Sequence, residues 1–255
     1  MKGKAFIGTS GWNYKHWRGT IYEPGFPQRL WLGRIAQQFD TVEVNTSFYS
    51  VPKRESVEAW ERATPPSFVF ALKLWRGITH YRKLRNAAEL TERFLQSAEA
   101  LTEDRRAPLL IQLPPNQGVD ADKLKAYIEQ FRSLAPGRWR LALEFRNNAW
   151  LQPAIYHLLD RLGVALCLHD MDGKGATDEA NDAPLVYVRR HGSGGQRYAG
   201  SYSPEQIALD AARILQWNES GKDVYVYYNN DIGGHAFYNA TALRESLRSI
   251  LEGRS

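Results

Sequence analysis

Leu141-Ala142-Leu143-Glu144-Phe145-Arg146-Asn147-Asn148-Ala149-Trp150 is the stretch that decides the fold, because it changes character within a few residues. It begins as an apolar strand, in which successive side chains point to opposite faces. Ala142, Glu144 and Arg146 therefore share one face, and the larger apolar residues share the other. A glutamate and an arginine on an inward face need a structural or functional reason, since such groups are rarely buried unless they are paired.

Strand-like stretches recur along the whole chain and alternate with helical patterns. The predicted strands are 5–8, 41–45, 68–73, 107–112, 140–144, 164–169, 185–190 and 223–229. The predicted helices are 28–38, 55–63, 88–101, 120–133, 149–162, 203–217 and 235–251. The segment 170–184 is rich in Gly and Asp, so we expect the helix after the sixth strand to be short or missing.

Alternating strands and helices predict a parallel sheet. Eight such units in 255 residues match a TIM (β/α)8 barrel, whose usual length is about 250 residues. The alternative is an open doubly wound sheet, but no Gly-x-Gly-x-x-Gly turn follows the first strand to support its dinucleotide-binding form. Without internal repeats or linkers, residues 1–255 are expected to form a single domain.

The composition is that of an ordinary globular protein, with 43% hydrophobic residues. A net charge of +5 permits weak attraction to phosphates or nucleic acid but is far from that of a polycationic tail. The single cysteine, Cys167, cannot form an internal disulfide and lies in an apolar run, so we expect an inert buried thiol. The chain shows neither a signal-peptide core nor a membrane span, and we expect a cytoplasmic protein.

The alternation of side chains places a polar group on the inner face at the end of nearly every strand. The inward positions are Glu43, Asn45, Lys73, Gln112, Glu144, Arg146, Tyr187, Arg189, His191, Tyr225, Tyr227 and Asn229. Active sites of TIM barrels lie at this end of the strands. We therefore interpret the ring as a functional site, the alternative being a packed polar plug.

The ring holds more positive than negative charge. Two carboxylates, Glu43 and Glu144, face Lys73, Arg146 and Arg189, and His191 can add a fourth cation. Opposite charges about 4 Å apart interact by roughly 4 kcal/mol at an effective dielectric of 20, which keeps each glutamate ionised. The surplus cation predicts an anionic substrate.

Two glycine-containing loops, 191–197 and 231–235, follow the last two strands. Loops at this position commonly bind phosphate, because their backbone N–H groups and a helix N-terminus face the anion. Simple flexibility is the alternative explanation of the glycines. A basic loop with Arg76, Arg82, Lys83 and Arg85 follows the third strand, and a solvated basic face would explain it equally well.

Aromatic residues cluster after the first three strands. They are Trp12, Tyr14, Trp17, Phe48, Tyr49 and Trp75. Such residues stack on bases or sugar rings, and beside basic groups they suit single-stranded or flipped nucleotides. The alternative is a hydrophobic lid on the barrel.

Seven ordered motifs resemble the YecE-like family, a domain of unknown function with a TIM-barrel fold. They are Gly8-Thr9-Ser10-Gly11-Trp12 with Tyr14 and Trp17, Val42-Glu43-Val44-Asn45 with Phe48-Tyr49, Ile78-Thr79-His80, Gln112-Leu113-Pro114-Pro115, Glu144-Phe145-Arg146 with Trp150, Tyr187-Val188-Arg189 with His191-Gly192, and Asn229-Asn230-Asp231 with Ala236 and Asn239-Ala240. The resemblance covers nearly the whole chain and implies the barrel, but no established reaction. It adds His80 and Asp231 to the candidate site residues.

Two other sites compete with an anion site. Glu144, His169 or Asp170, His191 and Asp231 could bind a divalent metal, as in sugar-isomerase and endonuclease barrels, although the neighbouring arginines argue against it. A glycosidase needs a pair of acids, and Glu43 with Glu144 is the one inward pair. We therefore predict no cofactor.

The sequence thus predicts an enzyme that hydrolyses a phosphoester or nucleic acid, or acts on another anionic substrate. Glu144 and His191 would be the acid–base pair, with Glu43 and Asp231 as further catalytic candidates. The expected substrate-binding residues are Trp12, Tyr14, Asn45, Lys73, His80, Gln112, Arg146, Arg189, Asn229 and Asn230. The alternatives are the metal-dependent enzyme and a non-catalytic protein that binds a nucleotide or nucleic acid.

Overall fold

The computed structural model describes residues 2–171, 179–193 and 198–253. Its eight strands form one parallel sheet in the order β3-β2-β1-β8-β7-β6-β5-β4. The strands are β1 (Ala5–Ser10), β2 (Thr41–Val44), β3 (Val69–Leu72), β4 (Leu109–Leu113), β5 (Leu141–Phe145), β6 (Ala165–His169), β7 (Leu185–Arg190) and β8 (Asp223–Tyr228).

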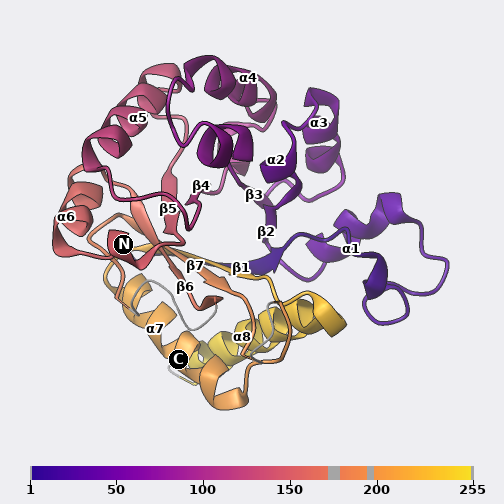
Figure 1. Cartoon of the computed structure of the whole chain (residues 1–255). Coiled ribbons are helices and arrows are strands. Elements are labelled where there is room, and N and C mark those ends of the chain that lie inside the picture. The colour runs from indigo at the N-terminus through magenta and orange to yellow at the C-terminus, as the bar shows by residue number, and fades with distance from the viewer. Residues whose placement is uncertain (1, 172–178, 194–197, 254–255) are drawn as a thin grey trace.

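Strands β3 and β4 close the sheet through a small number of backbone contacts. The N–H of Leu74 donates to the carbonyl of Leu110 at 2.8 Å, and the N–H of Ala107 donates to that of Phe70 at 3.0 Å. The sheet is therefore a barrel and not an open sheet, which confirms the predicted fold (Figure 1).

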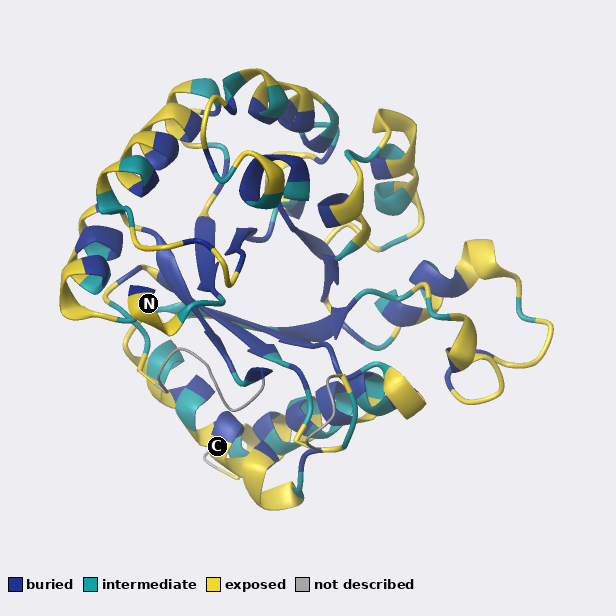
Figure 2. Cartoon of the chain, in the orientation of Figure 1, coloured by how far each residue is buried: buried dark blue, intermediate teal, exposed yellow. Residues whose placement is uncertain are grey.

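Helices surround the barrel, with buried faces toward the sheet and exposed faces outward (Figure 2). They are α1 (Trp31–Ala36), α2 (Thr46–Tyr49), α3 (Arg54–Arg62), α4 (Ala88–Ala98), α5 (Ala121–Leu134), α6 (Pro153–Arg161), α7 (Pro204–Glu219) and α8 (His235–Glu252). Asp120 begins α5 as predicted, since its carboxylate accepts from the N–H of Lys123 at 3.0 Å. Ser203 and Gln206 form a reciprocal capping box at the start of α7.

Several predicted boundaries were wrong. The helix expected at 28–38 is divided into the short turn η2 (Gln28–Leu30) and α1. The helix expected from 149 begins only at Pro153, because proline is favoured in the first turn of a helix, and the 3-10 turn η5 (Asn148–Trp150) precedes it. The sequence also missed α2 and a π-helical turn, η3 (Gly77–Tyr81).

After the sixth strand we expected the next helix, within 170–184, to be short or missing, and the structure describes this segment in part. Residues 172–178 lie outside the described residues, and the described remainder contains no α-helix. None of the helices in the described ranges combines the length and the apolar run needed to cross a membrane.

The apolar core has two layers that follow the strand alternation. One lies between the sheet and the helices, and the other fills the barrel with side chains such as Ala71, Leu110, Ala142 and Tyr225. Cys167 belongs to the inner layer and is fully buried, and burial raises the pKa of its thiol well above the usual value. The thiol is therefore protonated at neutral pH. This inner layer supports the polar groups of the barrel mouth.

Candidate functional site

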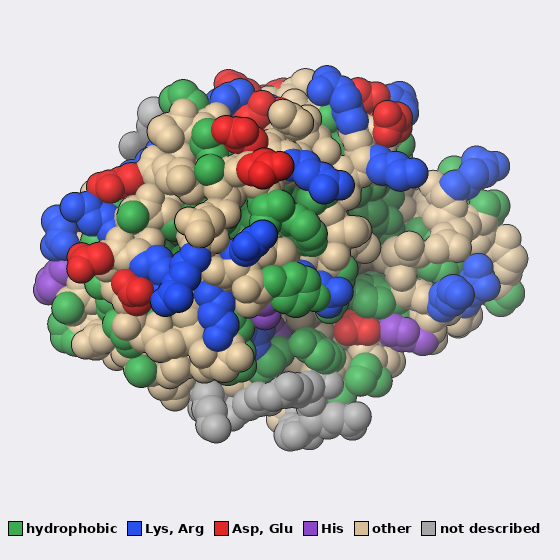
Figure 3. Space-filling model, turned by 45° about the horizontal axis from the view of Figure 1, so that its top comes forward, with side chains coloured by type: hydrophobic (Ala, Val, Ile, Leu, Met, Phe, Trp, Pro, Cys, Tyr) green, Lys and Arg blue, Asp and Glu red, His purple; other side chains and the backbone are tan. Residues whose placement is uncertain are grey.

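A cavity of about 800 Å³ opens at the carboxyl ends of the strands. Its polar lining includes Asn45, Lys73, Gln112, Arg146, Arg189 and Asn229, all of which the sequence predicted as substrate-binding residues. Aromatic side chains form much of the remaining wall, and the surface of Figure 3 shows basic and hydrophobic groups side by side. We call this cavity the mouth pocket.

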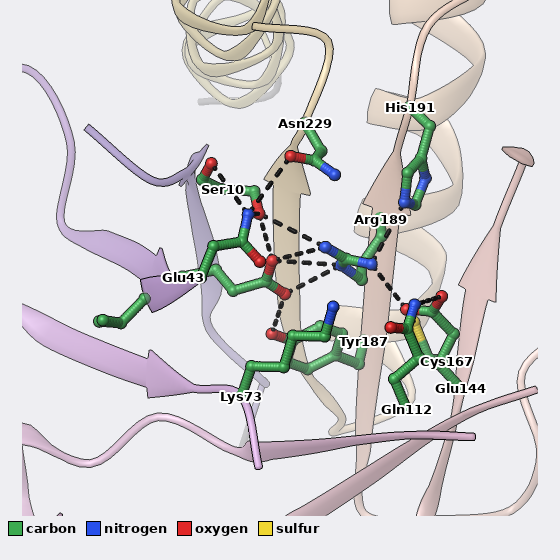
Figure 4. A network of polar contacts seen from close by, with 12 residues as sticks. Ser10, Glu43, Lys73, Gln112, Glu144, Cys167, Tyr187, Arg189, His191 and Asn229 are labelled. Carbon is green, nitrogen blue, oxygen red and sulfur yellow. Dashed lines mark hydrogen bonds and ion pairs between the residues drawn. The ribbon is translucent and has the colours of Figure 1, made fainter. Parts of the chain in front are cut away.

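Arg189 lies at the centre of a buried network beneath the mouth pocket (Figure 4). It extends from β7 and is 1% exposed. Its Nε donates to Glu43 Oε2 at 3.0 Å, and its Nη2 donates to Glu43 Oε1 at 2.8 Å and to Ser10 Oγ at 3.4 Å. Its Nη1 donates to Glu144 Oε2 at 2.7 Å and to His191 Nε2 at 3.2 Å. All five N–H donors of the guanidinium thus have acceptors inside the protein.

Glu43 and Glu144 are fully buried and lie on opposite sides of Arg189. Glu144 also accepts from Gln112 Nε2 at 2.7 Å and from Nε of Arg146. Burial alone would raise the pKa of Glu144, but Arg146 and Arg189 outweigh it and hold the pKa well below the usual range. The same balance, with Arg189 as the main cation, lowers the pKa of Glu43. Both carboxylates are therefore ionised.

His191 is 2% exposed, and its charge differs from the fourth cation that the sequence allowed. Its Nε2 accepts from Arg189 Nη1 at 3.2 Å and from Arg146 Nη2 at 3.1 Å. Guanidinium groups only donate, so this nitrogen carries no proton and the ring is neutral. Burial, and then the charge of Arg189, lowers the pKa of His191 to about 4, although Asp170 opposes the shift. His191 therefore does not add a fourth cation to the mouth.

Glu144 and His191 both contact Arg146 and Arg189, and their role as the acid–base pair stays a prediction. The residues that line the mouth pocket include Arg146 and Arg189, whereas Glu43, Glu144 and His191 are buried around these arginines and do not line it. The sequence correctly predicted that these side chains point inward. It could not predict their depth, because alternation gives the face of a strand and not the order of layers along the barrel axis.

Lys73 follows β3 directly and is 6% exposed. Its Nζ lies 4.0 Å from the centre of the Phe48 ring and forms no ion pair within the ranges that the structure describes. Burial, and then the positive charge of Arg189, lowers the pKa of Lys73 to about 7. Two glutamates face two arginines in the network, so Lys73 provides the surplus positive charge that the sequence predicted.

His80 and Asp231 are the other titratable side chains of the pocket wall. His80 packs edge-on against Phe48, and its Nδ1 is 2.9 Å from Oγ1 of Thr79. Burial, followed by the charge of Lys73, lowers the pKa of His80 to about 4. Oδ2 of Asp231 lies 3.2 Å from Nε2 of His16, and burial raises the pKa of the Asp231 carboxyl.

The rim is partly as predicted. Trp12, Tyr14, Phe48 and Tyr49 line the pocket, whereas Trp17 is fully buried and donates from Nε1 to the carbonyl of Asp231 at 2.8 Å. Arg76 lies between two exposed tyrosines, with its Cζ 5.2 Å from the ring centre of Tyr49 and 5.5 Å from that of Tyr81. Arg76 is the member of the predicted basic loop that lines the pocket.

The phosphate-binding role of the two glycine loops stays a prediction. In the second loop, Asp231 lines the mouth pocket, but a Cβ at Gly234 would lie 3.3 Å from Cδ1 of Ile21, so this glycine packs against the chain. In the first loop, a Cβ at Gly192 would lie 2.0 Å from the carbonyl oxygen of Ala199. Residues 194–197 of that loop lie outside the described residues.

Some site residues were misplaced or missed by the sequence. Asn230 is fully buried and donates to the carbonyl of Gly200 at 2.8 Å and to Asn239 Oδ1 at 2.9 Å, so it holds loops together. Ser10 was missed because the first strand was expected to end at Gly8. Extending the alternation by one more inward position would have found it, and its hydroxyl bonds Glu43.

The predicted metal ligands do not gather into a ligand group. Within the described parts of the chain, no three His, Cys, Asp or Glu side chains are placed to hold an ion. His169 Nε2 donates to the carbonyl of Phe145 at 2.9 Å, and both oxygens of Glu144 already accept from cations. In this arrangement, His169 and Glu144 form hydrogen bonds and ion pairs within the barrel mouth.

The fold and the site define a single-domain (β/α)8 barrel with a cationic, aromatic-walled pocket at the carboxyl ends of its strands. The family model described as "Protein of unknown function DUF72" matches residues 6–253, so the chain belongs to this family. The resemblance to YecE-like proteins is thereby confirmed.

Two bacterial relatives support the assignment. UPF0759 protein YunF of Bacillus subtilis is 26% identical over 270 residues, covering 95% of this chain and 94% of YunF. UPF0759 protein YecE of Escherichia coli is 30% identical over 142 residues, covering 56% of this chain and 48% of YecE. A crystal structure of a DUF72 family protein from Thermotoga maritima superposes with a TM-score of 0.83 at 26% identity, covering 96% and 99% of the two chains.

Proposed function

We propose that the mouth pocket is the active site of an enzyme that acts on a small phosphorylated or otherwise anionic substrate. The single observation that carries this proposal is Lys73, a buried cation at the pocket wall whose ammonium group forms no ion pair in the described chain. A buried charge without a partner is costly. A bound anion would supply the missing partner, which is a reason for the protein to favour the occupied state.

The other polar groups of the pocket divide into two roles. Arg189 adds positive charge but has no free donor, whereas Arg146 retains N–H groups beyond those used by Glu144 and His191. The side-chain amides of Asn45, Gln112 and Asn229 also line the pocket. Lys73 and Arg146 would therefore hold the anion, while the amides would orient the rest of the substrate.

Hydrolysis of a phosphoester is the reaction that we propose from the sequence. It requires a group that activates water and a group that stabilises the charge of the transition state. Because Glu144 and His191 are buried and do not line the pocket, the candidates for proton transfer become Asp231 and the neutral imidazole of His80. Lys73 and Arg146 would stabilise negative charge on the phosphoryl oxygens.

Ligand-induced stabilisation tests the anion site. Glycerol 3-phosphate and inorganic phosphate should raise the Tm of the wild type, because a ligand at 100 times its Kd adds about 2.7 kcal/mol of stability. Lys73→Met should lose this increase, whereas Lys53→Met, a change at an exposed lysine, should keep it. Glycerol is the uncharged control, and equal responses of wild type and Lys73→Met would refute the anion site.

Turnover tests the enzymatic part of the proposal. A panel of phosphomonoesters, phosphodiesters and short single-stranded oligonucleotides should contain a compound that the wild type hydrolyses and Asp231→Asn hydrolyses at least about tenfold more slowly. Binding of such compounds at the Lys73 site without any turnover would instead identify the protein as a binding protein.

A further inference from the structure

Lys73 differs from an ordinary phosphate-binding lysine in its surroundings. It follows the last residue of β3, its side chain is 6% exposed, and it lines the mouth pocket. In Figure 4 its amine points toward the space between Glu43 and Glu144, but no dashed line reaches it. The face of the Phe48 ring covers one side of the amine at 4.0 Å.

The neighbouring charges do not favour the ammonium form. Arg189 and Arg146 neutralise Glu43 and Glu144, and both arginines remain permanently charged. Four charged groups act electrostatically on the amine: Arg189, Glu144, Glu43 and Arg146. The charge of Lys73 in turn lowers the pKa of His80. Burial and the nearby guanidinium of Arg189 lower the pKa of Lys73 to about 7. A large fraction of the amine is thus unprotonated at neutral pH.

An unprotonated lysine beside a second cation is the arrangement that activates lysine as a nucleophile. We propose that Lys73 forms a covalent imine with the carbonyl group of an anionic substrate, whose acidic group binds at Arg146. The substrate class would then be a keto acid or a phosphorylated aldehyde or ketone. This inference rests on the anion-binding part of the proposed function, and it goes beyond hydrolysis.

The step balances without any oxidant or reductant. The Nζ lone pair attacks the carbonyl carbon, a C–N bond forms, and the C=O π electrons move to oxygen, which takes up a proton. The resulting carbinolamine takes up one more proton on its hydroxyl group while nitrogen releases one. The C–O bond then breaks with loss of water, and the nitrogen lone pair forms the C=N⁺ bond.

Protonation states in the pocket suit this order of reaction steps. Asp231 lines the same pocket, and burial raises the pKa of its carboxyl, which makes it a candidate proton donor for the departing water. The iminium product is cationic like the ammonium form of Lys73, and it lies near the ionised Glu43 and Glu144. It can accept electrons from a breaking C–H or C–C bond on the adjacent carbon, so the chemistry needs no further cofactor.

Lys73→Arg separates this inference from anion binding. Arginine retains a positive charge at this position but cannot form an imine under these conditions, because its guanidinium stays protonated. We expect Lys73→Arg to keep at least part of the Tm increase that glycerol 3-phosphate produces in the wild type. The same variant should form no reducible adduct at position 73.

Reductive trapping is the deciding experiment. The full-length protein is incubated separately with glyoxylate, pyruvate and glyceraldehyde 3-phosphate in the presence of cyanoborohydride, and modified peptides are quantified by mass spectrometry. With at least one probe, Lys73 should be labelled at least about tenfold faster than the exposed Lys53, because far more of its amine is unprotonated. Labelling of Lys73 should increase through pH 7, and inorganic phosphate should slow it.

Each outcome has a separate meaning. Labelling of Lys73 no faster than that of Lys53 with all three probes would overturn the imine proposal. If glycerol 3-phosphate stabilises both the wild type and Lys73→Arg in that case, the anion site stands without the imine. If phosphate compounds stabilise neither protein while Lys73 is still trapped by pyruvate, the amine is reactive but the phosphorylated substrate class is wrong.

Discussion

Nη1 of Arg189 donates to Oε2 of Glu144 at 2.7 Å, and neither side chain is more than 1% exposed. Glu43 accepts from the same guanidinium. Removal of Arg189 would therefore leave two buried carboxylates without the cation that they share. We expect Arg189→Met to lower the free energy of unfolding by about 3–5 kcal/mol, measured by urea denaturation. Arg54→Ala, which breaks an exposed pair with Glu58, should cost less than about 1 kcal/mol. Equal losses in the two variants would contradict the central role of Arg189.

Lys73 should make the stability of the protein depend on pH. The pKa of its amine is about 7 in the folded state against 10.5 for an ordinary lysine, so between these values the unfolded chain binds more protons. Stability from this group is therefore lowest below pH 7 and increases as the pH rises. Between pH 7 and about 9.5, the wild type should gain stability relative to Lys73→Met. The upper limit keeps the measurement below the usual tyrosine pKa of roughly 10. Parallel curves from denaturant titrations would refute the lowered pKa.

His191 should remain neutral across the physiological range. Its Nε2 accepts from two arginines and the pKa of its ring is lowered to about 4, so the proton is expected on Nδ1 from pH 5 to 8. Nitrogen-15 NMR of labelled histidine distinguishes this tautomer from imidazolium. The exposed His157 provides a second histidine signal in the same spectrum. A His191 signal that titrates near pH 6.5 would be inconsistent with the acceptor role.

The exposed tyrosines of the rim should affect ligand binding but not folding. Tyr49 is 60% exposed and Tyr81 is 69% exposed, so Tyr49→Ala and Tyr81→Ala should change stability by no more than about 0.5 kcal/mol. If these rings stack on part of the substrate, affinity for a ring-bearing phosphate should fall by roughly 1–3 kcal/mol per ring. Affinity for inorganic phosphate should stay unchanged. Calorimetric titration of both ligands measures the difference.

The sequence predicted the barrel well because the evidence for it is local and repeated. Strand alternation placed Glu43, Lys73, Glu144 and Arg189 on the inner face, and the structure confirms each position. A side chain's face depends only on its own strand, so a single sequence contains that information.

The hydrogen-bond partners could not be predicted from the sequence, for a physical reason. The pairing of Arg189 with both Glu43 and Glu144 depends on three strands that are distant in sequence, and on the length and rotamer of the arginine. The neutral state of His191 follows from these contacts, so it could not be predicted before them. The same holds for Lys73, whose lack of an ion-pair partner became apparent only when Glu43 and Glu144 were seen to pair with the two arginines.

The network around Arg189 also bears on how the chain is synthesised. Glu43 is made early, Glu144 near the middle and Arg189 only after about three-quarters of the chain, and Glu43 and Arg189 are 146 positions apart in the sequence. A nascent or truncated barrel that lacks β7 would hold two inward carboxylates with no shared guanidinium. Such an incomplete barrel would expose or hydrate its interior and present unpaired strand edges. Productive closure is therefore expected to wait for the C-terminal quarter of the chain, and chaperone binding is expected to be strongest just before that quarter leaves the ribosome.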